Sequence, residues 1–154
     1  MDRDILDIAR ESIKEHEGFS DKVYKCPAGF DTIGYGFRLS TLEYYGIKLT
    51  KPLSVELADH ILDYFIEKIY KYLEVKFPWV DGLPDNAIAI MIEMTFQLGA
   101  NGFYGFTNAI KYLKQHNFKN AAKEMLDSKW ARKDSPNRAK EMAEIIRKLA
   151  DESG

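Results

Sequence analysis

The segment SVELADHILDYFIEKIYKYLEVKFP, residues 54–78, is the longest stretch of the chain with one regular pattern. Apolar residues recur there at every fourth position, with a second apolar series beside them, which is the spacing of one face of a helix. Ser54 can cap the first turn through its hydroxyl oxygen, and Pro78 prevents continuation because proline has no N–H to donate. The sequence therefore predicts a long helix over residues 54–76.

The part before this helix combines another helix with short strands. Apolar residues from Ile5 onward, and then Glu17, recur at every fourth position and predict a helix that ends near Gly18, a residue that favours a left-handed C-terminal cap. Lys22–Tyr24 and Phe30–Phe37 are rich in β-branched and aromatic residues and are separated by a segment with a proline and a glycine, so they predict a β-hairpin. We expect Ile47–Thr50 to add a third short strand.

The part after the long helix has only helical patterns. Ala87–Leu98 is apolar nearly all round and is followed by Gly99, which is typical of a helix at the buried centre of a lobe. Shorter helices are expected over Asn108–Gln115 and Lys119–Asp127. The last helix begins at Ser135-Pro136-Asn137, with serine as N-cap and proline at the first helical position.

These patterns predict an α+β fold that is mainly helical. A small N-terminal lobe carries a short antiparallel sheet, a long helix follows, and the C-terminal lobe is helical. The length of 154 residues suits one domain, and the sequence contains no internal repeat or flexible linker. We expect a single domain over residues 1–154, with lobes at about 14–53 and at 74–154 plus the N-terminal helix, joined by helix 54–76.

The composition excludes several classes of function. Lys and Arg total 22 against 24 Asp plus Glu, a net charge of −2, so the chain lacks the basic surface of a nucleic-acid-binding protein. Its most apolar stretch is shorter than the roughly 20 residues that cross a bilayer, which predicts no stable membrane insertion. The three histidines and one cysteine show no metal-ligand spacing, and there is no glycine-rich phosphate loop, so neither a metal nor a cofactor is predicted.

The N-terminal sequence MDRDILDIARES has no apolar run of signal-peptide length. A single cysteine, Cys26, cannot form an internal disulfide and suits a reducing compartment. We expect a protein made in the cytoplasm without an export signal, acting as a monomer.

Glu17 is the most unusual carboxyl group in the chain. It continues an apolar helix face, so its carboxyl group is expected to point inward, and it stands at a helix C-terminus, where the helix dipole is negative. Both effects disfavour the anion, as a general acid requires. From the pattern alone, a solvated glutamate on a frayed last turn is the alternative.

Arg138 is unusual for a similar reason. It falls in the first turn of the last helix, where a cation opposes the dipole, and it lies on the inward face four residues before Met142. An inward arginine normally has an acidic partner because an unpaired buried charge is costly. Glu17 and Glu93 are the candidates, and an arginine that extends to solvent is the alternative.

Three blocks of the sequence resemble the phage-type lysozymes. That family has a glutamate, eight residues, an aspartate or cysteine, five residues, and a threonine; Glu17, Cys26 and Thr32 fit this spacing. The other two blocks resemble its central helix and its C-terminal signature. They are Phe96-Gln97-Leu98-Gly99 with Gly105-Phe106-Thr107-Asn108, and Trp130 with Ser135-Pro136-Asn137-Arg138-Ala139.

The resemblance implies a muramidase that acts on peptidoglycan glycan strands, with a lysozyme-like fold and no cofactor. Glu17 would be the general acid, Thr32 would help to hold the attacking water, and Arg138 would pair with Glu17. Phe96, Gln97 and Asn108 would lie along the saccharide cleft. Gly34, where the missing side chain allows close approach of a ligand or of backbone, is expected to bind substrate as well. The enzyme would reach the wall after another protein has permeabilised the inner membrane.

Cys26 occupies the position that is aspartate in the best-known members of that family. Glycosidases normally use two carboxyl groups. Here a thiolate could position water together with Thr32, which requires the site to lower the reference thiol pKa of about 8.5. Cys26 could instead attack the sugar as a covalent nucleophile. Asp31 is a third candidate for the second group, but strand alternation sends its side chain to the face opposite Thr32. We favour the water-positioning route.

Three other activities stay open at this point. The weaker base could favour a lytic transglycosylase, which needs no attacking water. Cys26 could be the nucleophile of a cell-wall peptidase or amidase. The chain could also be an inactive interaction module on a lysozyme scaffold.

Overall fold

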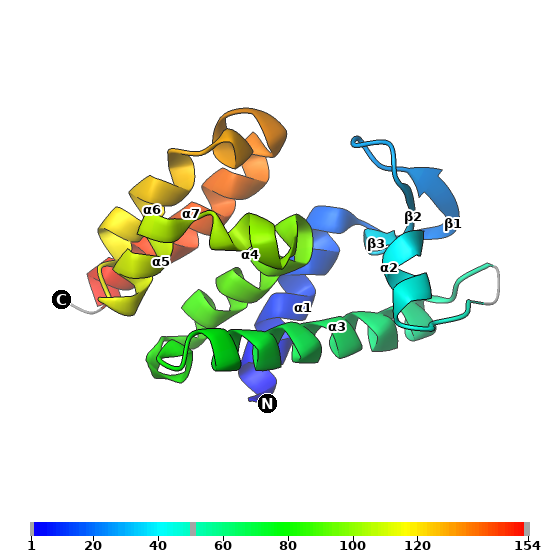
Figure 1. Cartoon of the computed structure of the whole chain (residues 1–154), viewed down its shortest axis with the longest axis horizontal. Helices are drawn as coiled ribbons and strands as arrows, with labels where there is room; N and C mark the ends of the chain where they lie inside the picture. Colours follow the sequence, from blue (N-terminus) through cyan, green and yellow to red (C-terminus); the bar gives the residue numbers. More distant parts are fainter. Residues whose placement is uncertain (1, 50–51, 153–154) are drawn as a thin grey trace. The chain divides into compact units, whose positions relative to one another are not determined.

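The computed structural model describes residues 2–49 and 52–152 and is about 71% helical, with one three-stranded antiparallel sheet (Figure 1). The α+β, mainly helical class predicted from the sequence is confirmed. The chain divides into two compact units. Residues 10–65 are called the strand unit, and residues 1–9 with 66–154 are called the helical unit.

Two helices contain residues of both units. α1 (Arg3–Glu17) ends where the sequence predicts, because Gly18 has a φ of +68° and its N–H donates to the Lys14 carbonyl over 3.0 Å. α3 (Val55–Lys76) is the predicted long helix, and the Leu57 N–H donates to Ser54 Oγ over 3.1 Å, which confirms the predicted cap.

The sheet of the strand unit has the order β1-β2-β3, with β1 (Ser20–Lys25), β2 (Asp31–Gly34) and β3 (Phe37–Arg38). A short helix, α2 (Leu39–Tyr44), follows β3 directly. The predicted hairpin is confirmed in β1 and β2, with Tyr24 opposite Thr32. β2 also pairs with β3, where Ile33 stands opposite Phe37.

Two details of the strand prediction are wrong. Phe30–Phe37 is not one strand, because Gly34 and Gly36 have φ angles of +68° and +74° and turn the backbone between β2 and β3. The third strand is therefore Phe37–Arg38, whereas residues 47–49 form no strand. Residue 50, the last of the predicted strand, lies outside the described residues.

The helical unit is built on α4 (Asp85–Tyr104), whose residues from Ala87 to Thr95 are all buried, as its apolar sequence predicts. The predicted end at Gly99 is a kink, since Gly99 has φ 77° and ψ 165° and helical residues follow it. The remaining elements are α5 (Thr107–Lys114), α6 (Phe118–Leu126), α7 (Pro136–Glu152), a 3-10 turn at Val80–Gly82 and a π-helical turn at Trp130–Asp134. α6 packs against both α5 and α7 (Figure 1).

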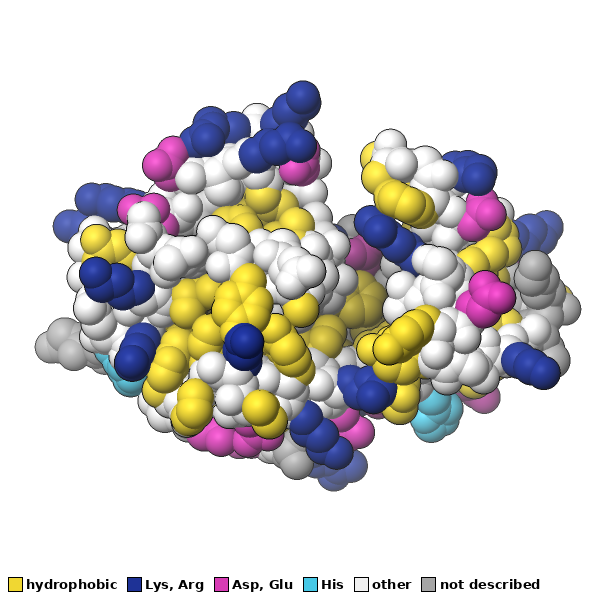
Figure 2. All heavy atoms as spheres, viewed as in Figure 1, with side chains coloured by type: hydrophobic (Ala, Val, Ile, Leu, Met, Phe, Trp, Pro, Cys, Tyr) yellow, Lys and Arg dark blue, Asp and Glu magenta, His cyan; other side chains and the backbone are white. Residues whose placement is uncertain are grey.

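The surface carries charges of both signs. Basic and acidic side chains are interspersed over the face shown in Figure 2, as the net charge of −2 implies. Of the helices in residues 2–49 and 52–152, none combines enough length with enough apolar residues to cross a bilayer.

Candidate active site

One face of the sheet brings several polar side chains together. Tyr24 of β1 stands opposite Thr32 of β2, which stands opposite Arg38 of β3. Residues directly opposite in antiparallel strands project to the same side of the sheet. The pairing continues beyond β1, where the Cys26 N–H donates to the Phe30 carbonyl over 3.0 Å. The two predicted site residues Cys26 and Thr32 therefore share this face with Tyr24 and Arg38.

Thr32 is fixed on this face. Its side chain is buried, with 2% of the residue exposed, and its hydroxyl donates to the Phe30 carbonyl over 2.8 Å. The same hydroxyl is among the groups that lower the pKa of the half-buried Cys26 thiol, after the backbone of Phe30 and Ala28. A buried hydroxyl with one rotatable proton can redirect its hydrogen bond when a better acceptor forms beside it.

The surroundings of Cys26 favour the thiolate. A hydrogen bond with the Phe30 backbone lowers the pKa of the Cys26 thiol most, and a second one with the Ala28 backbone, the Thr32 side chain and the Arg38 charge lower it further. Burial opposes these effects but does not outweigh them. The turn that joins β1 to β2 therefore shifts the pKa of the Cys26 thiol in the direction that a water-positioning thiolate needs, and that role stays a prediction.

Glu17, the last residue of α1, lies directly against Gly36. A Cβ atom at Gly36 would stand 2.3 Å from Glu17 Oε1 and 2.7 Å from its Cδ, so the Glu17 side chain would have to move away if residue 36 carried a side chain. Gly36 also has a φ of +74°, a conformation that side chains disfavour. The second glycine of Gly34-Tyr35-Gly36 thus makes room for the half-buried carboxyl group of the predicted general acid.

The turn that carries Gly36 is attached to the long helix. Tyr35, between the two glycines, donates its hydroxyl hydrogen to Asp59 of α3 over 2.8 Å. Lys14 of α1 forms an ion pair with the same carboxylate at 3.3 Å. One aspartate therefore holds both the turn and the last turns of α1, which fixes Glu17 from two sides.

Tyr24 lies near both predicted catalytic groups. Burial raises the pKa of the Tyr24 phenol, and the charges of Glu17 and Cys26 raise it further. Both groups must therefore be close enough to act on the phenol through space. The sequence analysis gave Tyr24 no role, because the face it occupies depends on the strand register.

Two other residues of the strand unit have structural partners. Gly34 is buried, and a Cβ atom there would meet the Phe37 ring at 2.7 Å and Leu53 at 3.1 Å, so side-chain packing requires this glycine. Its predicted contact with substrate stays a prediction. Asp31 forms an exposed ion pair with Lys25 at 2.8 Å. Asp31 precedes Thr32 in the same strand, so its side chain projects to the other face.

Arg138, in the first turn of α7, is paired with Glu93 of α4. Arg138 Nε and Nη2 stand 3.0 Å and 2.9 Å from Glu93 Oε2. The Glu93 side chain is wholly buried and that of Arg138 is 11% exposed. The structure therefore shows an acidic partner for the inward arginine, one of the two that the sequence offers, while the pairing with Glu17 stays a prediction.

Gln97 joins three elements of the helical unit. Its Nε2 donates to Ser135 Oγ over 2.9 Å, and its Oε1 accepts from Trp130 Nε1 over 3.0 Å. The Trp130 ring packs edge-on against Phe106 at 5.8 Å between centroids. The amide therefore orders the segment between α6 and α7, a role that the sequence analysis did not assign.

A groove of about 670 Å³ lies in the helical unit beside this network. Phe106, Asn108 and Trp130 line it together with the carboxylates of Glu124, Asp127 and Asp134. Asn108 is exposed at the start of α5, and Phe96 is half-buried in α4. Asn108 is thus placed where a ligand can reach it; the predicted saccharide contacts of Phe96, Gln97 and Asn108 stay predictions.

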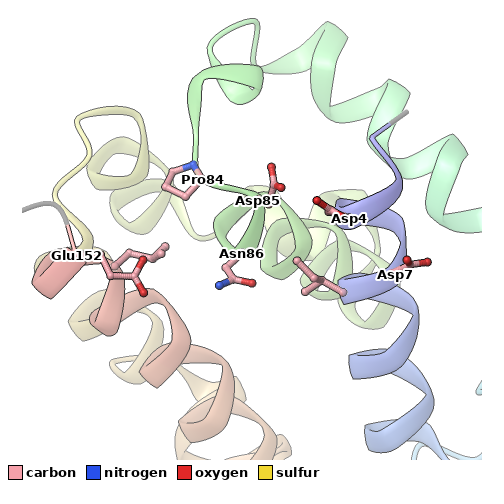
Figure 3. A pocket seen from close by; sticks show the side chains of 8 residues that line it. Asp4, Asp7, Pro84, Asp85, Asn86 and Glu152 are labelled. Carbon is pink, nitrogen blue, oxygen red and sulfur yellow. The ribbon is translucent and has the colours of Figure 1, made fainter.

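A second pocket of the helical unit is acidic. Asp4, Asp7, Asp85 and Glu152 are among its lining residues (Figure 3). One carboxylate oxygen from each of Asp2, Asp4 and Asp85 lies within 4.8 Å of the others. Burial and then the Asp2 and Asp4 charges raise the pKa of Asp85. Exposed acids gather in this way in many proteins without a bound ion, so we assign no metal to them.

The sequence analysis missed Arg38 as well as Tyr24. It took Phe30–Phe37 for one strand, so it had no third strand in which Arg38 could stand opposite Thr32. The two positive-φ glycines are the signal that would have revealed the turn.

Comparison with known families agrees with the resemblance in the sequence. A family model described as "Phage lysozyme" matches residues 14–152. The match includes each of the predicted site residues from Glu17 to Arg138.

Proposed function

The chain belongs to the phage lysozyme family, whose members are peptidoglycan-hydrolysing endolysins, and on this premise we propose that it is a muramidase with Glu17 as its general acid. The bond cleaved would be the β-1,4 linkage between N-acetylmuramic acid and N-acetylglucosamine. The observation that carries the proposal is the placement of the Glu17 carboxyl group against Gly36, in the unit whose sheet holds Cys26 and Thr32 on one face.

Glu17 suits the acid role because of where α1 ends. Glu17 is half-buried as the last residue of α1, and its carboxyl group lies directly against Gly36. It would donate a proton to the glycosidic oxygen, which then leaves with the bonding electron pair. Gly36 and the Asp59 contacts support a fixed position for the donor.

Cys26 and Thr32 would act on water from the other side of the sugar. Thr32 would orient the water by a hydrogen bond, and the Cys26 thiolate would accept its proton as the oxygen attacks the anomeric carbon. The proton lost by Glu17 and the proton gained by Cys26 balance, and the product has inverted configuration. The lowered pKa of the Cys26 thiol supports this role.

Mass spectrometry of purified peptidoglycan after digestion tests the proposal. Hydrolysis leaves new reducing N-acetylmuramic acid ends, and the anomer released first shows inversion. 1,6-Anhydro ends would instead indicate a lytic transglycosylase, and cleaved stem peptides would indicate a peptidase; either result would contradict the proposed hydrolysis.

Three variants separate the roles of Glu17 and Cys26. The E17Q variant should lose glycan cleavage because its amide cannot donate the proton, whereas C26D should stay active because a carboxylate can serve in place of the thiolate. The C26A variant should be strongly impaired. If the E17Q variant is as active as wild type, the protein is not a muramidase with Glu17 as its general acid.

Access to the wall is part of the same proposal. Endolysins of this family act on the cell wall, and we infer that this enzyme reaches it after a separate protein has permeabilised the inner membrane. Expression alone in intact cells should then cause no lysis, and lysis should begin when the membrane is damaged. Lysis by the enzyme alone, with the membrane intact, would oppose this inference.

A further inference from the structure

Arg38 is an exposed arginine with a defined position. It stands opposite Thr32 in the register of β2 and β3, and its guanidinium carbon lies 4.0 Å from the centroid of the Phe30 ring. Phe30 in turn accepts the Cys26 N–H at its carbonyl. A guanidinium that stacks on an aromatic ring loses much of the freedom of a solvated arginine. The stack therefore keeps a positive charge on the face that carries Cys26.

The other described groups around Cys26 differ from Arg38 in the charge that they offer to its thiol. Tyr24 is a neutral phenol, and Glu17, beyond it, carries the opposite charge when ionised. Lys25 and Asp31 form an ion pair on the other face of the hairpin, where their charges offset each other. Thr32 and the backbone of Ala28 and Phe30 offer hydrogen bonds but no net charge. The positive charge of Arg38 adds to these hydrogen bonds in lowering the pKa of the Cys26 thiol.

We propose that Arg38 is a positioning residue of the reaction: stacked on Phe30, it holds Cys26 as the thiolate that positions the attacking water. This inference rests on the proposed function, and it extends it to a residue that the family's acid–thiol–threonine spacing does not include. A carboxylate at position 26 would ionise by itself at neutral pH. A thiol requires stabilisation of its anion, and Arg38 together with the turn provides it.

The test is the rate of Cys26 alkylation by iodoacetamide as a function of pH, since only the thiolate reacts. Cys26 is the single cysteine, so the label reports on it alone. In the R38Q variant the midpoint of the profile should move to higher pH, and alkylation at neutral pH should slow by roughly two- to fivefold, the size expected for an exposed charge. The difference should shrink in high salt, which screens exposed charges.

Two matched variants show whether the charge is the cause. R38K keeps the charge without the planar stack and should give a profile between those of wild type and R38Q. R132Q removes an exposed arginine from the helical unit and should leave the profile unchanged. Identical profiles for wild type and R38Q, or for R38K and R38Q, would overturn the inference. Equal melting temperatures would exclude a general loss of structure.

Measurements of peptidoglycan cleavage then test whether the ionised thiol takes part in the reaction. R38Q should lower peptidoglycan cleavage at neutral pH, and the activity should recover as the pH rises. In a C26D background, R38Q should have little effect, because the carboxylate needs no help to ionise. If C26A is as active as wild type, the proposed role of Cys26 is wrong, while the alkylation profiles still decide whether Arg38 stabilises the thiolate.

Discussion

At the scale of single residues, Gly36 shows how a glycine makes room for the carboxyl group that we propose as the general acid. Two separate features favour glycine at this position: the backbone has a positive φ, and a Cβ atom would overlap the Glu17 carboxyl group. A substitution would strain the backbone and displace Glu17. The sequence pattern indicated a close approach at the Gly-x-Gly turn, but it did not identify the group that approaches.

The G36A variant should therefore lose more activity than its stability explains. The positive φ alone should reduce the free energy of unfolding by about 1 kcal/mol, while the displaced Glu17 should reduce glycan cleavage by tenfold or more, as roughly expected for a misplaced catalytic group. Chemical denaturation and a cleavage assay measure the two effects.

Gly46 offers the matched control, because it has a similar φ of +69° with no atom within 4 Å of its Cβ position. G46A should lose comparable stability and keep its activity. If G36A retains activity as G46A does, the close contact with Glu17 has no functional meaning.

At the scale of helices and strands, regular patterns were predictable and local exceptions were not. The long apolar series of α3 and the capping residue Ser54 predict that helix nearly to the residue. The breaks at Gly34 and Gly36 and the kink at Gly99 depend on backbone dihedral angles, which composition does not reveal. The candidate site has the same limit: Glu17, Cys26 and Thr32 were predicted from the resemblance to the family, whereas Arg38 required the strand register.

The pair of Arg138 and Glu93 joins α7 to α4, and breaking it from one side should be costly. In the R138M variant the wholly buried Glu93 carboxylate loses the Arg138 guanidinium, so we expect the free energy of unfolding to fall by about 3–5 kcal/mol. Denaturant titration at neutral pH measures this loss.

A control comes from the exposed pair of Arg147 and Glu144 in the same helix α7. R147M should change stability little, because solvent screens exposed ion pairs. If R138M and R147M lose the same free energy of unfolding, burial does not make the pair of Arg138 and Glu93 more important to stability than an exposed pair.

Acidic residues meet at the starts of α1 and α4. Among them, Asp2 stabilises α1 as a helix cap, but its charge also repels that of Asp85. Asp2 Oδ1 accepts the Asp4 N–H over 2.8 Å and caps α1, while its charge raises the pKa of Asp85. A raised pKa in the folded state means that the fold binds more protons than the unfolded chain just above pH 3.8, so stability falls as the pH rises through this range.

The D2N variant should keep the cap, because an asparagine oxygen can accept the same hydrogen bond, and it should remove the repulsion. We expect its melting temperature to exceed that of wild type by about 1 °C at neutral pH and low salt. The gain should shrink in acid, as the pH falls through the raised pKa of Asp85 and this carboxyl group loses the charge that is repelled. A gain that persists in acid would have a cause other than charge.

At the scale of the whole molecule, family membership and composition agree. The family match extends over residues 14–152, and the net charge of −2 gives no sign of the basic surface that nucleic-acid binding requires. The blocks that carry the resemblance occur in both compact units, with Glu17, Cys26 and Thr32 in the strand unit and Gln97 and Arg138 in the helical unit. The activity is therefore expected to require the full chain.

The central claim is that Glu17 donates the proton that breaks the glycosidic bond. The most direct measurement is the rate at which reducing ends appear in purified peptidoglycan treated with equal concentrations of wild type or E17Q. Equal melting temperatures of the two proteins show that the substitution has not unfolded the chain. A general acid contributes roughly 10²- to 10⁴-fold, so E17Q should be slower by at least 100-fold. An E17Q rate within tenfold of wild type would contradict the claim.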